Sequence, residues 1–338
     1  MVTTVDRWLA EGESVALATV VETWGSAPRV PGAKMAVSST GRIVGSVSGG
    51  CVESAVVEAA VKVLRTRTPR LLHFGVADDT AWAVGLACGG SIDVFVAPLD
   101  RAFYDVERAA LLAGRPFAVA TMISGPEEPF GQQLFLDAED NRAGGFEDAL
   151  GVLTEEALRA ALAAGRSRRQ PLPASELFLE VTLPAPTLVI VGGVHIAVAL
   201  VPLAKSVGYR VVVVDPRPAF ASSARFPLAD EIVGDWPNDA LAKIGLTSQT
   251  AVAVFAHDPK LDDPALQVAL PSAAFYVGAL GSKRTQEKRR ARLAEAGVSE
   301  EHLARLHAPI GLDLGGRSPE EIALSVIAQI VAARNGRA

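Results

Sequence analysis

Cysteine, positive charge and long apolar runs are all scarce in this chain of 338 residues. The two cysteines, Cys51 and Cys88, form no CxxC pair, and no HExxH motif or close His/Cys cluster is present. A zinc or iron–sulfur site built by the protein is therefore not expected. The two thiols could pair by number alone, but a cytosolic chain keeps its thiols reduced.

The charge balance and the missing apolar runs exclude two classes of partner. The formal net charge of −6 argues against a general nucleic-acid or membrane-surface binder. The N-terminus has no basic segment followed by an apolar one, and no run reaches the roughly 18 uninterrupted apolar residues of a spanning helix. We therefore expect a cytoplasmic protein with neither nucleic acid nor membrane as a partner.

The length allows two domains with sizeable cores. The main boundary is expected at Pro184-Ala185-Pro186, because two prolines interrupt strand pairing before a new apolar run begins. We expect an N-terminal domain at residues 1–100, a middle segment at 101–184 packed with it, and a C-terminal domain at 185–338. The sequence shows neither an internal repeat nor a low-complexity tail.

The C-terminal part alternates apolar strands with helices. Near-continuous apolar runs at residues 188–191, 210–214, 251–255 and 274–277 predict strands that are buried on both faces of a parallel sheet. The predicted fold class is α/β, with a small N-terminal α/β domain followed by a Rossmann-like, doubly wound parallel sheet.

The stretch from residue 24 to residue 53 is too rich in glycine, serine and proline to be ordinary core. Residues 35–38 and 42–47 are expected to pair as a hairpin. Ser48, Gly49 and Gly50 then precede a helix that is expected to start at Cys51. Glycines before a helix start leave free N–H groups that suit an anion, so these residues and Glu53 are candidates for binding a cofactor.

Cys51 is the sharper of the two thiol candidates. In the first turn of a helix after two glycines, it is expected to be a better nucleophile or ligand than a free cysteine. Arg29 and Lys34 would add positive charge if the hairpin folds back over the helix start. The alternative is a small buried residue that allows the helix to pack closely on a strand. Cys88 adjoins Gly89 and Gly90 in a similar way.

The turn after residues 188–191 is compared with the dinucleotide fingerprint G-x-G-x-x-G/A. Gly192, the final Ala197 and Asp215, 23 positions after Gly192, match it, while Val194 stands where the second glycine belongs. Gly193 partly compensates by shifting the turn, and His195 follows. Either the site binds NAD(P) or FAD, or the fold has lost its dinucleotide and serves as scaffold and interface.

Other polar residues follow the predicted strands, where the ligand crevice of such folds lies. His257 is either a ligand-side residue there or a strand-end side chain bonded to Asp258 or to the backbone. Gly281 and Ser282 open a basic helix whose start suits an anion. The candidate residues of this crevice are Gly192, Gly193, His195, Asp215, Arg217, His257, Asp258, Gly278, Gly281, Ser282 and Lys283.

The chain resembles the XdhC/CoxI family of molybdenum-enzyme accessory proteins. The resemblance rests on GSAPRVPGAKM (25–35), GSVSGGCVE (45–53) and CGGSIDVFVAPL (88–99), which follow one another with the family's spacing. In the second half it rests on HDPKLDDPAL (257–266), YVGALGSKRT (276–285) and the segment 308–332. Family members usually read G-A-G-H where this chain has Gly192 to His195, which weakens the expectation of a nucleotide. The resemblance adds a third possible outcome for this turn, the binding of a pterin or nucleotide-containing form of a molybdenum cofactor.

The resemblance implies an accessory protein, not an enzyme, that binds the molybdenum cofactor (molybdopterin) and inserts it into a client. The implied partners are an apo-molybdoenzyme of the xanthine dehydrogenase or carbon monoxide dehydrogenase type, a cysteine desulfurase that supports sulfuration, and a second copy in a homodimer. Cys51 and Cys88 would be thiols on the molybdenum side, with Arg29, Lys34, residues 48–50 and residues 89–90 nearby. Two alternatives stay open: an NAD(P)- or FAD-dependent oxidoreductase, and an interaction scaffold without a ligand.

Overall fold

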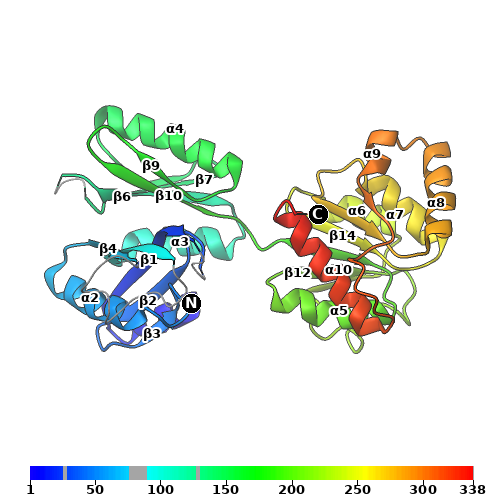
Figure 1. Cartoon of the computed structure of the whole chain (residues 1–338), viewed down its shortest axis with the longest axis horizontal. Helices are drawn as coiled ribbons and strands as arrows, with labels where there is room; N and C mark the ends of the chain where they lie inside the picture. Colours follow the sequence, from blue (N-terminus) through cyan, green and yellow to red (C-terminus); the bar gives the residue numbers. More distant parts are fainter. Residues whose placement is uncertain (26–28, 76–89, 127–129, 338) are drawn as a thin grey trace. The chain divides into compact units, whose positions relative to one another are not determined.

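The computed structural model describes residues 1–25, 29–75, 90–126 and 130–337. The chain forms two compact units, Met1–Pro184 and Ala185–Ala338, and the division falls within the Pro184-Ala185-Pro186 segment of the sequence (Figure 1). Within the described ranges, no helix combines the length and the apolar character that crossing a membrane requires.

The first unit begins with an antiparallel sheet in the order β3-β2-β1-β5-β4. One face of this sheet is covered by α2 (Glu53–Thr66), which buries Val56, Ala60 and Val63 against it. These residues recur at helical spacing, so the apolar stripe alone directs the helix onto the sheet. The strands are β1 (Val15–Trp24), β2 (Lys34–Ser38), β3 (Ile43–Gly45), β4 (Arg70–Phe74) and β5 (Ser91–Pro98).

A second antiparallel sheet, in the order β8-β7-β6-β10-β9, packs face to face on the first. Val21 and Phe95 of the first sheet meet Ile123 and Phe178 of the second. The outer face of the second sheet is covered by α4 (Asp148–Ala164), so the unit has four layers: helix, sheet, sheet, helix (Figure 1). The strands are β6 (Phe117–Ser124), β7 (Gln133–Asp137), β8 (Arg142–Gly144), β9 (Arg168–Pro171) and β10 (Glu176–Thr182).

The two halves of this unit repeat one topology. The first half runs α1-β1-β2-β3-α2-β4-β5 and the second runs α3-β6-β7-β8-α4-β9-β10, where α1 is Val2–Ala10 and α3 is Arg101–Leu112, and both sheets have the same strand order. Gly45 and Gly144 end equivalent strands with φ of +86° and +70°. A Cβ would lie 2.3 Å from the Lys34 carbonyl oxygen at Gly45 and 2.2 Å from that of Gln133 at Gly144.

The expectation of no internal repeat is therefore wrong at the level of the fold. Only demands of the backbone are shared between the halves, such as these two glycines. The side chains differ, so the repeat is not visible in the sequence.

The second unit is a parallel sheet in the order β13-β12-β11-β14-β15-β16. This is the 3-2-1-4-5-6 order of the doubly wound dinucleotide-binding fold, so the predicted fold class is confirmed. The strands are β11 (Thr187–Val191), β12 (Arg210–Val214), β13 (Glu231–Val233), β14 (Thr250–Val254), β15 (Tyr276–Ala279) and β16 (Leu306–His307).

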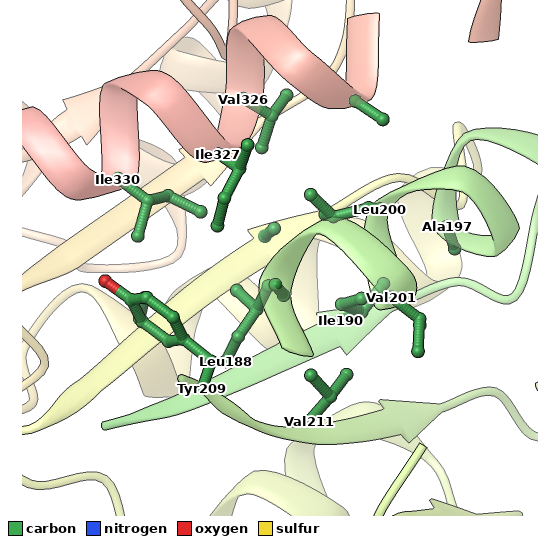
Figure 2. Packing of buried hydrophobic residues seen from close by; sticks show 14 of the residues in the cluster. Leu188, Ile190, Ala197, Leu200, Val201, Tyr209, Val211, Val326, Ile327 and Ile330 are labelled. Carbon is green, nitrogen blue, oxygen red and sulfur yellow. The ribbon is translucent and has the colours of Figure 1, made fainter. Parts of the chain in front are cut away.

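Helices cover both faces of the parallel sheet. On one face, α5 (His195–Ser206) and α10 (Pro319–Arg334) pack Leu200, Val326 and Ile330 over Leu188 and Ile190 of β11 (Figure 2). The other face has its own apolar core. It is covered by α6 (Pro237–Ile244), α7 (Pro259–Ala269), α8 (Lys283–Glu295) and α9 (Glu300–Ala304).

Candidate functional site

Three connections of the first unit begin or end at the same end of the strands in its first sheet. The registers place Trp24 opposite Ser91, Met35 opposite Gly45, and Phe74 opposite Ile92. The strand residues that flank the connections 25–33, 46–52 and 75–90 therefore lie together at this end of the sheet, although they are far apart in the sequence.

The second repeat shows which parts of these loops the fold requires. The connection between β3 and α2 spans residues 46–52, whereas the equivalent β8–α4 connection spans only 145–147. The connection between β4 and β5 spans residues 75–90, but the β9–β10 connection needs only 172–175. The same topology closes without the additional residues, so the first repeat carries them for another purpose.

The loop before α2 is organised around the carboxylate of Glu53. Glu53 accepts hydrogen bonds from the backbone N–H groups of Ser48 (2.9 Å), Gly49 (3.0 Å) and Gly50 (2.8 Å), and from the hydroxyls of Ser46 (2.7 Å) and Ser48 (2.5 Å). Burial alone would raise the pKa of Glu53, but the bonds from Ser48, Ser46 and the backbone outweigh it and lower the pKa to about 2.

These N–H groups were expected to be free for a cofactor anion, and this expectation needs correction. The anion that they bind is the carboxylate of Glu53, the first residue of α2. Glu53 itself faces its own loop and is not turned out toward solvent, because its carboxylate accepts all five of these bonds.

Cys51 lies on the outside of this loop. Its backbone N–H donates to the Ser48 hydroxyl oxygen at 3.0 Å, and the residue is solvent-exposed with a free thiol. The alternative of a small buried packing residue is therefore wrong. The helix begins at Glu53, two residues later than expected, so Cys51 precedes the helix and is not in its first turn.

The other residues that were expected to contribute to this site have different environments. Gly90 is buried just before β5, while Cys88 and Gly89 lie outside the described residues. Arg29 is exposed in the loop at residues 25–33 and has no ion-pair partner within the described ranges.

Lys34 does not add charge to the α2 start as expected, because its side chain extends from the opposite face of the sheet. Its ammonium lies 2.9 Å from Glu180 of β10, and both side chains line a cavity of about 40 Å³ between the two sheets. Burial alone would lower the pKa of Lys34, but Glu180 and Glu107 raise it. Glu107 has a pKa raised by burial, against the effect of Lys34.

In the second unit, the glycine-rich turn after β11 is in close contact with the chain's own backbone. Gly192 has φ of +102°, and a Cβ there would lie 2.6 Å from the Ala256 nitrogen. A Cβ at Gly193 would lie 2.2 Å from the Phe220 carbonyl oxygen. Both glycines are therefore required for packing within the chain. Val194 is the N-cap residue of α5, and the exposed His195 is the helix's first residue.

Asp215 is bonded to the protein and not free for a ribose. Its carboxylate accepts from the Gly193 N–H at 2.8 Å and from the Arg217 side chain at 2.7 and 2.9 Å, and the residue is 1% exposed. Burial alone would raise the pKa of Asp215, but the bonds from Arg217 and Gly193 lower it. A dinucleotide needs this acid and the glycine turn, so the geometry speaks against NAD(P) or FAD.

The remaining crevice residues have local structural roles. Asp258 caps α7 by accepting from the Lys260 N–H at 3.0 Å, and Ser282 caps α8 by accepting from the Thr285 N–H at 3.2 Å. A Cβ at Gly278 would lie 2.7 Å from Ile310, and Gly281 has φ of +141°. The side chain of Lys283 lies outside the described part of the structure.

His257 differs from these residues, because it adopts φ of +58° without being glycine. Such backbone strain is more frequent at functional sites than elsewhere.

The second unit also contains a buried ion pair that sequence reasoning did not identify. Asp262 lies 2.8 Å from Arg289, and each side chain is 2% exposed. Burial raises the pKa of Asp262, against the effect of Arg289. No sequence signal indicates this pair, because its members lie 27 positions apart on α7 and α8. Within the described ranges, no group of three or more His, Cys, Asp or Glu residues is arranged to hold a metal.

Comparison with known proteins agrees with this architecture. Residues 188–330 match the XdhC Rossmann domain, and residues 8–75 match the XdhC and CoxI family. The chain belongs to the XdhC and CoxI family, as the resemblance of its motifs indicated.

Two relatives and one solved structure span almost the whole chain. A probable xanthine dehydrogenase subunit of Bacillus subtilis is 30% identical over 98% of this chain and 97% of its own length. The "Molybdenum cofactor insertion chaperone PaoD" of Escherichia coli is 28% identical over 96% of this chain and 85% of its own. The crystal structure of a xanthine dehydrogenase from Bacillus halodurans superimposes with a TM-score of 0.78 at 28% identity, covering 99% of this chain and 96% of that one.

Proposed function

We propose that this protein binds the molybdenum cofactor as cargo and inserts it into an apo-molybdoenzyme of the xanthine dehydrogenase or carbon monoxide dehydrogenase type. The observation that carries this proposal is the loop at residues 46–52, which presents an exposed Cys51 and is longer than the equivalent connection at residues 145–147 of the second repeat. Its context is a family whose relatives include a molybdenum cofactor insertion chaperone.

The chemistry of the cargo suits this loop. The cofactor is a phosphorylated pterin whose dithiolene sulfurs hold molybdenum, so a site for it benefits from a soft sulfur donor and from cations. Cys51 supplies the thiol, and the exposed Arg29 on the neighbouring loop supplies a cation. Glu53 has a different role: through Ser48 it fixes the backbone that carries Cys51, which keeps the thiol outward.

The proposal includes two further partners, a cysteine desulfurase and a second copy of the chain. The cysteine desulfurase supplies the sulfur for sulfuration while the protein holds the cofactor, and the client enzyme receives the cofactor afterwards. The chain is expected to act as a homodimer, and native mass spectrometry of the gently purified protein would report both the cargo and the number of copies.

The proposal is tested by measuring the molybdenum and pterin that copurify after expression with molybdate. Wild type is expected to retain both, and Cys51→Ala to retain less by roughly tenfold or more, the loss that disturbing a metal site typically causes. Ser54→Ala is the matched control, because Ser54 is exposed on the first turn of α2 and is expected to leave retention unchanged.

Two results would contradict the proposal. One is a wild-type protein without pterin or molybdenum, and the other is full retention by Cys51→Ala. Tight binding of NADPH or FAD in a titration would instead favour the oxidoreductase alternative, and a client complex that forms without any ligand would favour the scaffold alternative.

A further inference from the structure

The first unit contains two adjoining cavities, one of about 40 Å³ between its sheets and one of about 140 Å³ beside α1 and α3. The larger cavity is lined by Met1 and Leu111, which are 47% and 42% exposed, so it opens to solvent. A cavity of about 150 Å³ can hold a molecule of about six non-hydrogen atoms. The residues that line both cavities are Leu17, Lys34, Tyr104, Glu107 and Glu180. Three charged side chains therefore stand where the two cavities meet, in a space large enough for a small ligand.

The charged groups at this junction have unused hydrogen-bonding capacity. Glu180, 2.9 Å away, is the only ion-pair partner that Lys34 has within the described ranges. Because an ammonium carries three N–H donors, two donors of Lys34 remain available. Glu107 takes part in no hydrogen bond or ion pair among the residues that the structure describes; burial raises its pKa, and Lys34 lies close enough to oppose this effect. A ligand can therefore satisfy both groups at once.

The second repeat shows that the fold can be built without these charges. Residues of the two halves are equivalent when they occupy the same place in the strand registers, or lie the same number of positions before the following strand. The equivalent pairs are Lys34 with Gln133, Glu180 with Ala97, and Glu107 with Val5. None of these three counterparts is charged. Because moving charges out of water is costly, a largely buried group of charges that the fold does not require favours a ligand-binding role.

The available groups match a ligand that carries both signs of charge. An ammonium group on the ligand would donate to Glu107, and a carboxylate on it would accept from the remaining N–H groups of Lys34. The wall of the larger cavity also includes the apolar Val2, Val5 and Phe117, which suit a short apolar side chain. An α-amino acid such as alanine has both charged groups and about the size that the cavity admits.

We propose that these cavities bind a small amino acid with a short apolar side chain, whose carboxylate is held by Lys34 and whose ammonium group is held by Glu107. None of the residues involved belongs to the loop of Cys51. The site is therefore a further binding function of the first unit, and it does not depend on the proposed function.

The test is isothermal titration calorimetry of the full-length protein with three small molecules. L-alanine is expected to bind with a Kd of about 0.01–1 mM, the range that a good ligand of this size reaches. Propionate lacks the ammonium group and ethylamine lacks the carboxylate. Each is therefore expected to bind at least about tenfold more weakly than L-alanine, because one charged group of the site stays unpaired.

Glu107→Gln removes the charge of the acceptor at nearly constant volume and is expected to weaken binding of L-alanine about tenfold or more. Asp105→Asn is the matched control, because it makes the same change on the same helix, where Asp105 is exposed and lies 3.0 Å from Arg101. It is expected to bind L-alanine like wild type. Lys34→Gln combined with Glu180→Ala installs the residues of the second repeat and is expected to abolish binding. Far-ultraviolet circular dichroism checks that each variant is folded.

Three results would overturn the inference. Absence of binding by L-alanine up to about 10 mM would leave the cavities to water. Equal affinity for ethylamine and L-alanine would remove the role of Lys34, and unchanged affinity of Glu107→Gln would place the ligand elsewhere. Because the comparison of the three molecules uses the wild-type protein, it decides the inference even if a variant does not fold.

Discussion

Single carboxylates decide what the two glycine-rich segments of this protein can bind. The Glu53 carboxylate accepts hydrogen bonds from the N–H groups of Ser48, Gly49 and Gly50. The Asp215 carboxylate accepts one from the N–H group of Gly193. In both places, backbone donors that are typical of anion sites are satisfied within the chain. The Gly193 N–H is buried, and leaving a buried donor without an acceptor is costly, so its bond to Asp215 stabilises the fold.

The ion pair of Asp215 makes the stability of the second unit depend on pH. The folded-state pKa of Asp215 lies below its ordinary value of 3.8, so the unfolded chain takes up the proton at higher pH than the folded chain. The stabilisation is therefore fully present above roughly pH 5 and is lost as the pH falls through the folded-state pKa. Asp215→Asn is expected to lower the free energy of unfolding by about 1–3 kcal/mol at neutral pH. The loss is smaller than for a fully buried pair, because the side chain of Arg217 is 38% exposed and screened by solvent.

This prediction is checked by chemical denaturation of wild type and Asp215→Asn at pH 7 and at pH 3. The difference between the two proteins should be largest at pH 7 and should shrink toward pH 3. A difference that grows as the pH falls would contradict the assigned direction of the pKa shift.

Among the elements, the connection between β3 and α2 distinguishes the first repeat from the second. Its residues 46–52 contribute the buried Val47 and Val52 to the core as well as the exposed Cys51. The short connection at residues 145–147 shows that a strand and a helix of this geometry can be joined more directly. The longer loop is thus compatible with the fold but not demanded by it.

A loop exchange tests this separation of fold and function. Replacing residues 46–52 by residues 145–147 is expected to lower the free energy of unfolding by roughly 3–6 kcal/mol for the two lost valines, while unfolding stays cooperative. Retention of molybdenum and pterin is expected to be abolished. The measurements are thermal unfolding by circular dichroism and metal analysis of the purified protein.

The control exchange replaces residues 39–42 by residues 138–141, the equivalent connection of equal length at the opposite end of the strands. It is expected to preserve cargo retention. If the control also abolishes retention, the effect belongs to the whole sheet and not to the loop of Cys51.

The whole molecule consists of two units with separate hydrophobic cores. The clusters of the first unit involve α1 to α4 and its two antiparallel sheets, whereas the clusters of the second lie on the two faces of the parallel sheet. Each unit has the size and the core of an independent domain. The boundary at Pro184 and Ala185 falls where no strand or helix is interrupted.

Separate production of residues 1–184 and 185–338 should therefore yield two folded proteins. Each is expected to show cooperative thermal unfolding and the far-ultraviolet circular dichroism of its own elements. Under the proposed function, the first fragment retains Cys51 and its loops. A fragment that is molten or aggregates at low concentration would show that its core is completed by the other unit.

The second unit was largely predictable from the sequence. Its strands are buried on both faces and therefore read as apolar runs, and helices of periodic pattern separate them, so local pattern suffices for a parallel, doubly wound sheet. In the first unit the hairpin of β2 and β3 was also predicted, because a short glycine-containing turn between two strands is a local signal.

Tertiary structure decided the remainder. The repeat of the first unit is carried by backbone geometry and not by side chains, and the direction of Lys34 depends on which face of the sheet the second sheet covers. Two glycines before a helix and a cysteine in its expected first turn predicted a loop of chemical interest. They did not predict that Glu53 would accept hydrogen bonds from the N–H groups of this loop or that Cys51 would be exposed. Sequence patterns report local conformation and burial, whereas the partner of a donor and the exposure of a thiol depend on which distant segments the fold brings together.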